Sequence, residues 1–195
     1  MQKPKIKIIL GSTREGRAGD KVAKWVNDYM QQQSKDMDVE LLDLRDFPLP
    51  FLSEAQTPSQ RKIGEYPNEA VAKWGKKILE ADGFVVVTPE YNHSFPAVLK
   101  NAFDYVYHEW NRKAITFVSY GGSTGGGRSV EQLRQIAVEL QMVPVRYAVH
   151  IVNYWDLAND KGELNFDAYI GGLKTTVEQL LWWTNALKTA REQKV

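Results

Sequence analysis

The chain has 195 residues, of which 43% are hydrophobic and 25% charged, and its formal net charge is +1 at pH 7. This composition is typical of a globular protein with a sizeable core. A net charge near zero gives no general attraction to nucleic acid or to a membrane surface, so we expect neither as a partner. The absence of cysteine excludes disulfides, cysteine-ligated metals and a thiol nucleophile.

The N-terminal residues carry neither the long apolar stretch nor the small-residue cleavage site of a secretory signal. No apolar run approaches the roughly 20 residues that are needed to span a bilayer. We therefore expect a cytoplasmic protein. The length suits one core, which predicts a single domain over residues 1–195.

Short apolar runs alternate with amphipathic segments along the chain. The apolar runs predict five strands, over residues 6–10, 39–44, 83–88, 114–119 and 144–151. Apolar residues at helical spacing predict five helices, over residues 19–33, 69–80, 95–107, 129–141 and 166–189. Prolines interrupt residues 45–67 repeatedly, so we expect a long irregular loop there, with its first part packed.

This alternation implies parallel strands that are joined by right-handed crossovers. We therefore predict an α/β protein of three layers, in which helices cover both faces of a five-stranded parallel sheet. Ligands of such sheets bind beyond the carboxyl ends of the strands, where the strand order reverses. The loops after the first, third and fourth strands are rich in functional residue types. If these strands are neighbours, the three loops meet at one edge of the sheet.

The first loop, over residues 11–20, joins a strand to a helix. Free N–H groups and the helix dipole favour an anion at a helix start. The hydroxyls of Ser12 and Thr13 and the guanidinium groups of Arg14 and Arg17 can hold a phosphate. The loop fits neither the dinucleotide fingerprint nor the Walker pattern. It therefore predicts a site for a phosphate monoester, with a capped helix and two solvated arginines as the alternative.

The second and third loops suit a flat ring. Residues 88–96 offer backbone amides, an aromatic ring and an amide side chain, which fit a heteroaromatic edge that carries donors and acceptors. The alternative is a turn in which Asn92 caps the next helix. In the third loop, Gly121 and Gly122 let a ring lie close to the backbone. A mobile surface loop is the alternative there.

These three motifs are similar to those of the NADPH-dependent FMN reductase family, which includes azoreductase-like and quinone-reductase-like members. The resemblance rests on Gly11-Ser12-Thr13-Arg14 with Arg17, on Pro89-Glu90-Tyr91-Asn92 with Ser94-Phe95-Pro96 and Leu99-Lys100-Asn101-Ala102, and on Ser119-Tyr120-Gly121-Gly122. The motifs stand in family order and spacing between about Ile6 and Val149. The resemblance implies a flavodoxin-like fold with strand order 2-1-3-4-5, bound FMN, and a homodimer or homotetramer with the flavin near the subunit boundary.

The resemblance also implies which residues bind FMN. The set is Gly11, Ser12, Thr13, Arg14, Arg17, Ala18, Gly19, Pro89, Glu90, Tyr91, Asn92, Ser119, Tyr120, Gly121 and Gly122. The first loop would hold the phosphate, the second would lie along the ribityl chain and the ring edge, and the third would approach the ring from its other side. Many relatives have a hydroxyl or amide residue near position 18 or 19. Here Ala18 and Gly19 supply only backbone donors, which places more of the phosphate binding on the two arginines.

The implied activity is an exchange in two steps. NADPH or NADH gives a hydride to the flavin, and a small-molecule acceptor such as free flavin, a quinone or an azo compound then takes the electrons. This scheme needs no catalytic side chain and no metal. His93 is the nearest candidate for a proton donor, although a loop histidine of this kind is more often solvated.

Two other functions stay open at this point. A flavodoxin-like electron carrier or a flavin-binding regulatory protein would use the same loops, but carriers typically have a strongly acidic docking surface, and the net charge here is +1. A phosphatase or nucleotide-binding module would keep the phosphate loop, but no carboxylate pair or metal-ligand set is apparent.

Aromatic residues give some support to self-association. Four of them crowd residues 103–110, and Trp182 and Trp183 are adjacent, so both cannot face the same core. Aromatic residues are enriched at interfaces, although packing under a loop explains them equally well. The sequence does not identify the acceptor, the preferred nicotinamide cofactor or the number of subunits.

Overall fold

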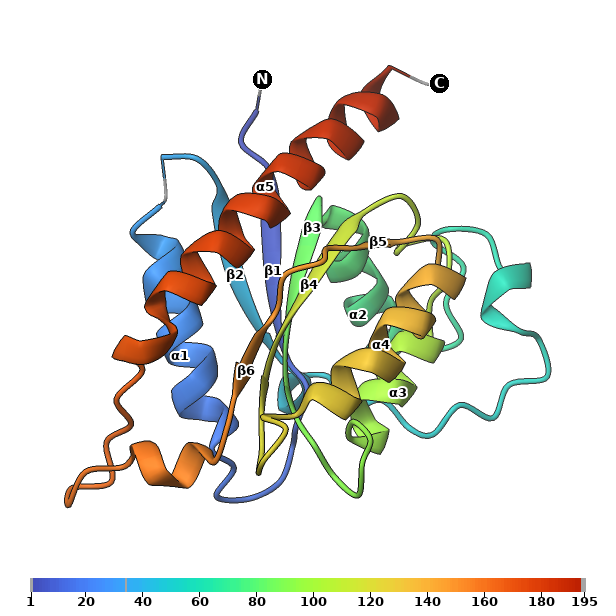
Figure 1. Ribbon diagram of the computed structural model, residues 1–195. Coiled ribbons are helices and arrows are strands. Elements are labelled where there is room, and N and C mark those ends of the chain that lie inside the picture. Colours follow the sequence, from blue (N-terminus) through green and yellow to red (C-terminus); the bar gives the residue numbers. More distant parts are fainter. Residues whose placement is uncertain (1, 34, 194–195) are drawn as a thin grey trace.

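The computed structural model describes residues 2–33 and 35–193, and a parallel sheet runs through its middle (Figure 1). The strands are β1 (Lys5–Leu10), β2 (Asp38–Asp43), β3 (Gly83–Pro89), β4 (Ala114–Tyr120), β5 (Val143–Pro144) and β6 (Val149–Ile151). Their order is β2-β1-β3-β4-β5, and β6 also pairs with β4. The predicted flavodoxin-like arrangement, with strand order 2-1-3-4-5, is confirmed.

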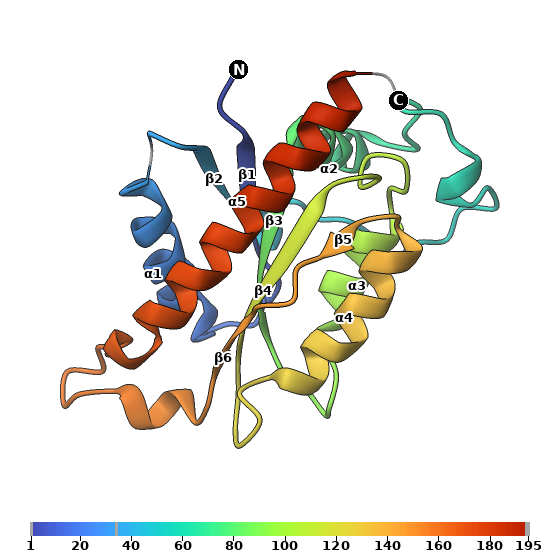
Figure 2. The ribbon, with the colours of Figure 1, turned by 45° about the horizontal axis from the view of Figure 1, so that its top comes forward.

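Helices cover both faces of this sheet. On one face lie α1 (Gly19–Gln31) and α5 (Ile170–Glu192), and Figure 2 shows α5 crossing the strands diagonally. The opposite face is covered by α2 (Glu69–Glu80), α3 (Ala97–Asp104) and α4 (Gly127–Glu139). Each face has its own apolar core, and β3 is buried along its whole length between them. Within the two described ranges, no helix combines the length and the apolar character that crossing a bilayer requires.

The local sequence explains α2 well. The side chain of Asn68 caps the helix by accepting a hydrogen bond from the Val71 N–H at 3.0 Å. Trp74 and Ile78 lie on its inner face and are fully buried. The Trp74 ring meets the Trp110 ring edge to face, with 6.1 Å between centroids. Helical spacing and a capping residue agree here, and the helix has the predicted bounds.

The strand that was predicted over residues 144–151 is interrupted, and only β5 and β6 pair with β4. The Arg134 guanidinium donates to the carbonyl of Val145 at 2.6 Å and to that of Arg146 at 2.8 Å. These side-chain contacts take the place of ladder hydrogen bonds for the two carbonyls. The prediction of one continuous strand was therefore wrong, because the competing donor comes from a helix that precedes it in the chain.

Four of the five helices also have bounds that differ from the prediction: α1 ends at Gln31, α3 covers Ala97–Asp104, α4 covers Gly127–Glu139 and α5 covers Ile170–Glu192. The helix that was predicted over residues 95–107 begins at Ala97, because a residue before proline, here Phe95, is disfavoured in helical conformation. The last helix begins at Ile170, after a short 3-10 turn, and not at residue 166. The long loop contains only two 3-10 turns, over Leu44–Asp46 and Pro58–Gln60.

The register of the strands brings three strand ends to one edge. Leu10 of β1 pairs with Val87 of β3, and Val87 pairs with Val118 of β4. Just beyond β1, the Gly11 N–H still donates to the Val87 carbonyl at 2.8 Å. The loops that follow β1, β3 and β4 therefore start at the same level, along the lower edge of the sheet in Figures 1 and 2.

A buried lysine, Lys113, directly precedes β4 and reaches the last turn of α2. Lys113 is only 5% exposed, and its Nζ donates to the carbonyls of Ile78 at 2.7 Å and Leu79 at 3.0 Å. Burial, helped by the charge of Arg191, lowers the pKa of Lys113 to about 7. An unfolded chain binds this proton up to about pH 10.4, so the unfolded state holds more protons between these two pKa values. The resulting destabilisation is complete below about pH 7 and is relieved as the pH rises.

We predict that the free energy of unfolding rises between about pH 7 and pH 9.5 more steeply in the wild type than in Lys113→Met, which lacks the titrating group. Urea unfolding at a series of pH values measures both slopes. Lys76→Met, on the exposed side of α2, serves as the control and should keep the wild-type slope. Equal slopes in the wild type and Lys113→Met would contradict the assignment.

Candidate functional site

A cavity of about 210 Å³ lies at the edge where β1, β3 and β4 end. Its lining comes from the three predicted loops and from one further turn. The lining residues are Arg14, Arg17, Ala18, Pro89, Glu90, Tyr91, Tyr120, Gly121, Gly122, Tyr154 and Trp155. The predicted meeting of the three loops at one edge of the sheet is confirmed.

The start of α1 is open toward this cavity. Its first residue is Gly19, and within the described residues the N-cap residue, Ala18, provides no side-chain hydrogen bond to cap the helix. The first N–H groups of a helix have no partner within the helix, and the helix dipole adds positive potential there. A Cβ at position 19 would lie 2.6 Å from the Tyr120 hydroxyl and 2.8 Å from the Leu10 Cδ1, so a side chain there would force these groups to shift. The tyrosine ring thus packs directly on the first turn of the helix.

The guanidinium of Arg17 is buried and fully occupied by protein acceptors. Its Nε donates to Asp20 at 2.8 Å, and its Nη2 donates to Asp20 at 2.6 Å and also to Asp43. Its Nη1 donates to Asp43 at 2.9 Å and to the Ser12 carbonyl. Because a guanidinium has five N–H donors, no donor is left for a phosphate. This differs from the expectation for Arg17, and we interpret the residue as one that shapes the loop.

Arg14 is arranged differently. Its side chain is exposed, and its guanidinium lies over the Tyr91 ring, 6.0 Å from the centroid. Arg14 forms no ion pair with a carboxylate in the part of the chain that the structure describes. Beneath it, the buried Ser12 Oγ shares a hydrogen bond of 2.8 Å with the Tyr91 hydroxyl. Arg14 therefore keeps its donors for a ligand, while the Ser12 hydroxyl joins the first loop to the second.

Two residues at the end of β2 support the first loop, and the sequence analysis did not single them out. Asp43 accepts from Arg17 and from the Arg45 N–H, at 2.9 Å in the latter case. The Arg45 side chain donates to the carbonyls of Thr13, at 3.3 Å, and Arg14. Burial alone would raise the pKa of Asp43, but the two arginines outweigh it and hold that pKa below its usual value. Their place directly after a strand is the signal that could have identified them.

The second loop turns sharply after Tyr91. Tyr91 and Ser94 exchange backbone hydrogen bonds of 2.7 and 3.0 Å, and φ is +50° at Asn92 and +67° at His93. Positive φ at both central residues defines the type I′ hairpin turn. Both of these side chains are exposed and lie outside the cavity lining. The turn aims Tyr91 inward, and the structure gives the Asn92 and His93 side chains no contact with the cavity.

Glu90 links the second loop to the third. Its carboxylate accepts from the Arg128 Nη1 at 2.7 Å and from the Thr124 Oγ1 at 3.0 Å. Burial alone would raise the pKa of Glu90, but these hydrogen bonds dominate and lower it below the usual value. Glu90 is therefore an anion at neutral pH, and the guanidinium of Arg128 on α4 balances its charge.

Adjacent residues of β4 face opposite ways. The Ser119 Oγ lies 2.7 Å from the Gly125 carbonyl and 2.8 Å from the Nδ1 of His150, so it holds the glycine-rich loop and does not line the cavity. Tyr120 does line it, and its ring packs edge to face on Tyr154, with 5.5 Å between centroids. The Tyr120 hydroxyl is buried and has no hydrogen-bond partner in the described part of the chain. Burial raises the pKa of Tyr120, so this unpartnered hydroxyl stays protonated.

A turn after β6 completes the cavity wall with Tyr154 and Trp155, which the sequence analysis did not identify. The Tyr154 N–H donates to the Gly121 carbonyl at 3.3 Å, and the Asn153 N–H donates to the Gly122 carbonyl at 3.2 Å. The signal was available, because the turn follows a parallel strand at its carboxyl end. The sequence analysis did not use this signal, because it predicted one continuous strand over residues 144–151 and did not identify β6 as a separate strand.

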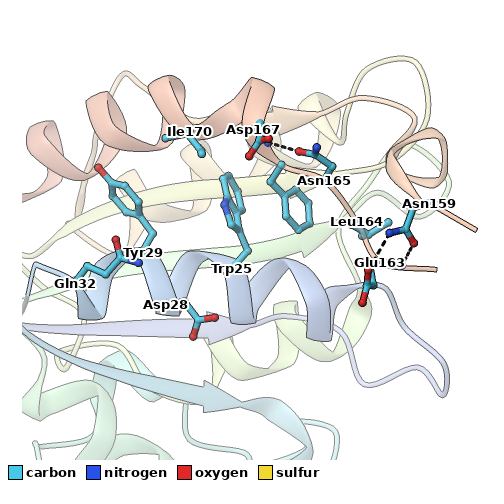
Figure 3. Close-up of a pocket in the computed structure, with 11 residues that line it drawn as sticks. Trp25, Asp28, Tyr29, Gln32, Asn159, Glu163, Leu164, Asn165, Asp167 and Ile170 are labelled. Atoms are coloured by element: carbon cyan, nitrogen blue, oxygen red, sulfur yellow. Dashed lines mark hydrogen bonds between the residues drawn. The ribbon is translucent and has the colours of Figure 1, made fainter. Parts of the chain in front are cut away.

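A larger cavity of about 660 Å³ lies elsewhere, between α1 and residues 159–170 (Figure 3). Trp25 stacks there on Phe166 with 4.6 Å between ring centroids. The charged side chains that line it are all acidic, namely Asp28, Glu163 and Asp167. They would repel a phosphate, whereas Arg14 faces the smaller cavity. Of these two cavities, charge therefore favours the smaller one as the candidate phosphate site.

Comparison with known proteins agrees with this geometry. The family model of NADPH-dependent FMN reductases matches residues 4–156. The chain belongs to this family. An NAD(P)H-dependent FMN reductase of Schizosaccharomyces pombe is 46% identical over 139 residues, which cover 71% of this chain and 68% of that protein. An NAD(P)H:quinone oxidoreductase of Solanum tuberosum is 38% identical over 144 residues, 71% of each chain.

The fold is shared with a solved flavoenzyme of low identity. FerB of Paracoccus denitrificans, an NAD(P)H:(acceptor) oxidoreductase, superposes with a TM-score of 0.72 at 19% identity, covering 94% of this chain and 98% of FerB. At this identity the likeness shows the fold alone. The family relationship itself rests on the sequence matches.

The cleft of this FMN reductase family member fits the cofactor that gives the family its name. FMN ends in a phosphate monoester. Among residues 2–33 and 35–193, the cleft offers a helix start without a side-chain cap, an Arg14 guanidinium without an ion pair and a Tyr120 hydroxyl without a hydrogen-bond partner. An isolated buried hydroxyl is costly unless a partner completes its hydrogen bond. The residues present therefore suit an anionic, oxygen-rich ligand such as FMN.

Tyr120→Phe tests the role of the unpartnered hydroxyl. We predict that the FMN-free protein gains about 1 kcal/mol of unfolding free energy, because an unsatisfied buried group is removed. FMN affinity should fall by about 0.5–1.5 kcal/mol, because a hydrogen bond to the cofactor is lost. Thermal unfolding and FMN fluorescence titration measure the two effects. Tyr147→Phe, at an exposed tyrosine, is the control, and a loss of stability in Tyr120→Phe would contradict the interpretation.

The two arginines of the first loop should behave differently on substitution. We predict that Arg14→Ala weakens FMN binding by about 1.5–3 kcal/mol, the value of a hydrogen bond to a charged group, with little change in stability. Arg17→Met should instead lower the free energy of unfolding by about 2–4 kcal/mol, because it leaves Asp43 without its buried partner. FMN titration and urea unfolding of both variants separate the roles. Equal effects on stability would show that Arg17 is not structural.

Proposed function

We propose that this chain is an FMN-dependent NAD(P)H oxidoreductase that reduces a small-molecule acceptor such as a quinone, a free flavin or an azo compound. The observation that carries the proposal is the cleft at the carboxyl edge of the sheet. Arg14, the open start of α1 and the Tyr120 hydroxyl converge there on a space that three loops enclose. Family membership supplies the chemistry that this cleft serves.

The cleft residues divide the binding of FMN among them. Arg14 and the backbone amides of Ala18 and Gly19 would hold the phosphate, with Ser12 and Thr13 in the same loop after Gly11. The second loop, from Pro89 to Asn92, would hold the ribityl chain and the ring edge. The backbone of Gly121 and Gly122 would contact the ring, with Ser119 and Tyr120 behind it. Arg17 supports the first loop from inside.

FMN, when bound, would supply the hydride chemistry that links NADPH or NADH to the acceptor. The residues of the chain bind and orient the reactants. Glu90 is held as an anion by Arg128, and Tyr120 is held protonated by burial, so neither group is poised for proton transfer near neutral pH. The protein therefore contributes position and electrostatics, and we assign no catalytic side chain.

We further propose that residues 1–195 act as one domain in the cytoplasm and assemble as a homodimer or homotetramer. The aromatic residues of α5 support self-association, because Trp182 is 65% and Trp183 36% exposed and neither faces the core. Within residues 103–110, Phe103 and Trp110 are buried in the core and supply no docking surface. Gel filtration with light scattering measures the number of subunits.

Anaerobic reduction tests the activity. The purified protein, reconstituted with FMN, should show an oxidised flavin spectrum that bleaches on addition of NADPH or NADH and returns on addition of a quinone. A flavin-loaded protein that neither nicotinamide bleaches would instead be an electron carrier or a flavin-binding regulator. Failure to take up FMN would exclude all of these functions. Initial rates with both nicotinamides and with several acceptors then identify the substrates.

A further inference from the structure

Trp155 places a large aromatic ring on the wall of the flavin cleft and leaves more than half of it in solvent. The residue is 54% exposed although it lines the cavity. Its ring meets the Tyr154 ring edge to face, with 5.3 Å between centroids. A Cβ at Gly122 would meet the tip of the indole at 3.5 Å, so the ring borders the third loop closely.

Backbone hydrogen bonds on both sides of Trp155 hold the turn that carries this ring. The Asn153 and Tyr154 N–H groups donate to the third loop, as described above, and the Asp156 N–H donates to the Asn153 carbonyl at 2.8 Å. Asn153 adopts φ of +44°, a left-handed conformation in which asparagine is tolerated better than most residues. The exposure of Trp155 is therefore a property of an ordered turn that is tied to the cleft.

A single exposed apolar residue needs no explanation by itself. Trp182 is such a residue, at 65% exposed on α5, and it lines none of the described cavities. Trp155 differs in two respects, because it borders the cleft and its backbone is held by the loop that faces the ring of the cofactor. A flat apolar surface in that position suits a flat apolar molecule that enters the cleft.

We propose that Trp155 is a substrate-positioning residue, the ring against which a planar aromatic electron acceptor packs as it reaches the flavin. The proposal rests on the proposed function and refines its substrate class. It makes the enzyme favour planar, quinone-like acceptors over small inorganic oxidants, because only a planar aromatic molecule gains contact with the indole face.

The test compares Trp155→Ala and Trp155→Phe with the wild type, all loaded with FMN. The acceptors are a naphthoquinone and ferricyanide, with NADPH in excess. In Trp155→Ala the ratio of the naphthoquinone KM to the ferricyanide KM should rise about 5- to 10-fold, because the free energy of one aromatic contact corresponds to a change in affinity of about that size. In Trp155→Phe, which keeps an aromatic ring, the ratio should stay close to the wild-type value. Phe51→Ala, at an exposed aromatic residue that lines neither cavity, is the matched control and should keep the wild-type ratio.

A binding measurement keeps the proposal independent of turnover. Naphthalene-2-sulfonate is planar and is not an electron acceptor, so its affinity for the FMN-loaded protein can be measured by calorimetry. Trp155→Ala should bind it several-fold more weakly than the wild type and Trp155→Phe nearly as well. This measurement remains valid even if the wild type reduces no acceptor, which separates failure of this proposal from failure of the proposed function.

Three results would overturn the proposal. An unchanged KM ratio in Trp155→Ala is one, and unchanged affinity for naphthalene-2-sulfonate is another. The third is a fall in FMN affinity of Trp155→Ala that matches its effect on both acceptors, which would place the ring in the cofactor site. FMN fluorescence titration of the same variants detects that case.

Discussion

The buried guanidinium of Arg17 holds the first loop, residues 11–20, in place. Its five N–H donors reach Asp20 on α1, Asp43 at the end of β2 and the Ser12 carbonyl after β1. Three separate elements are thus fixed to one side chain, and removal of one partner would leave a buried charge unpaired. Because Arg17 pairs with both Asp20 and Asp43, and Arg14 forms no ion pair within the described residues, the Arg14 guanidinium stays available at the surface.

A chain of further contacts extends this order around the cleft. Ser12 is hydrogen-bonded to Tyr91, which joins the first loop to the second. Glu90 accepts from Thr124, which joins the second loop to the third. The third loop in turn accepts from the Tyr154 N–H of the last turn. The walls of the cleft are thereby set before any ligand enters, so that little ordering remains to oppose binding.

Much of the fold and of the candidate site could be predicted from the spacing and types of residues close in sequence, and the errors have specific physical causes. Strand, helix and loop order follows from the spacing of apolar residues, and the convergence of the loops follows from parallel pairing. The roles of Arg14 and Arg17 could not be separated, because the two stand in one loop and the deciding partner, Asp43, lies 26 residues further along the chain. The last strand was predicted as continuous for the same reason, since a side chain on α4 interrupts it.

The sequence by itself determined the α/β alternation, the family and the three loops that carry the site, because these depend on short-range spacing and on residue type. Only the tertiary structure decided which side chains face the cleft. Ser119 and Tyr120 are neighbours on β4, yet the serine holds the glycine-rich loop and the tyrosine directs its unpartnered hydroxyl at the start of α1. Trp155 reaches the same cleft from a turn outside every motif. The side-chain alternation of a strand, together with partners distant in sequence, set these outcomes.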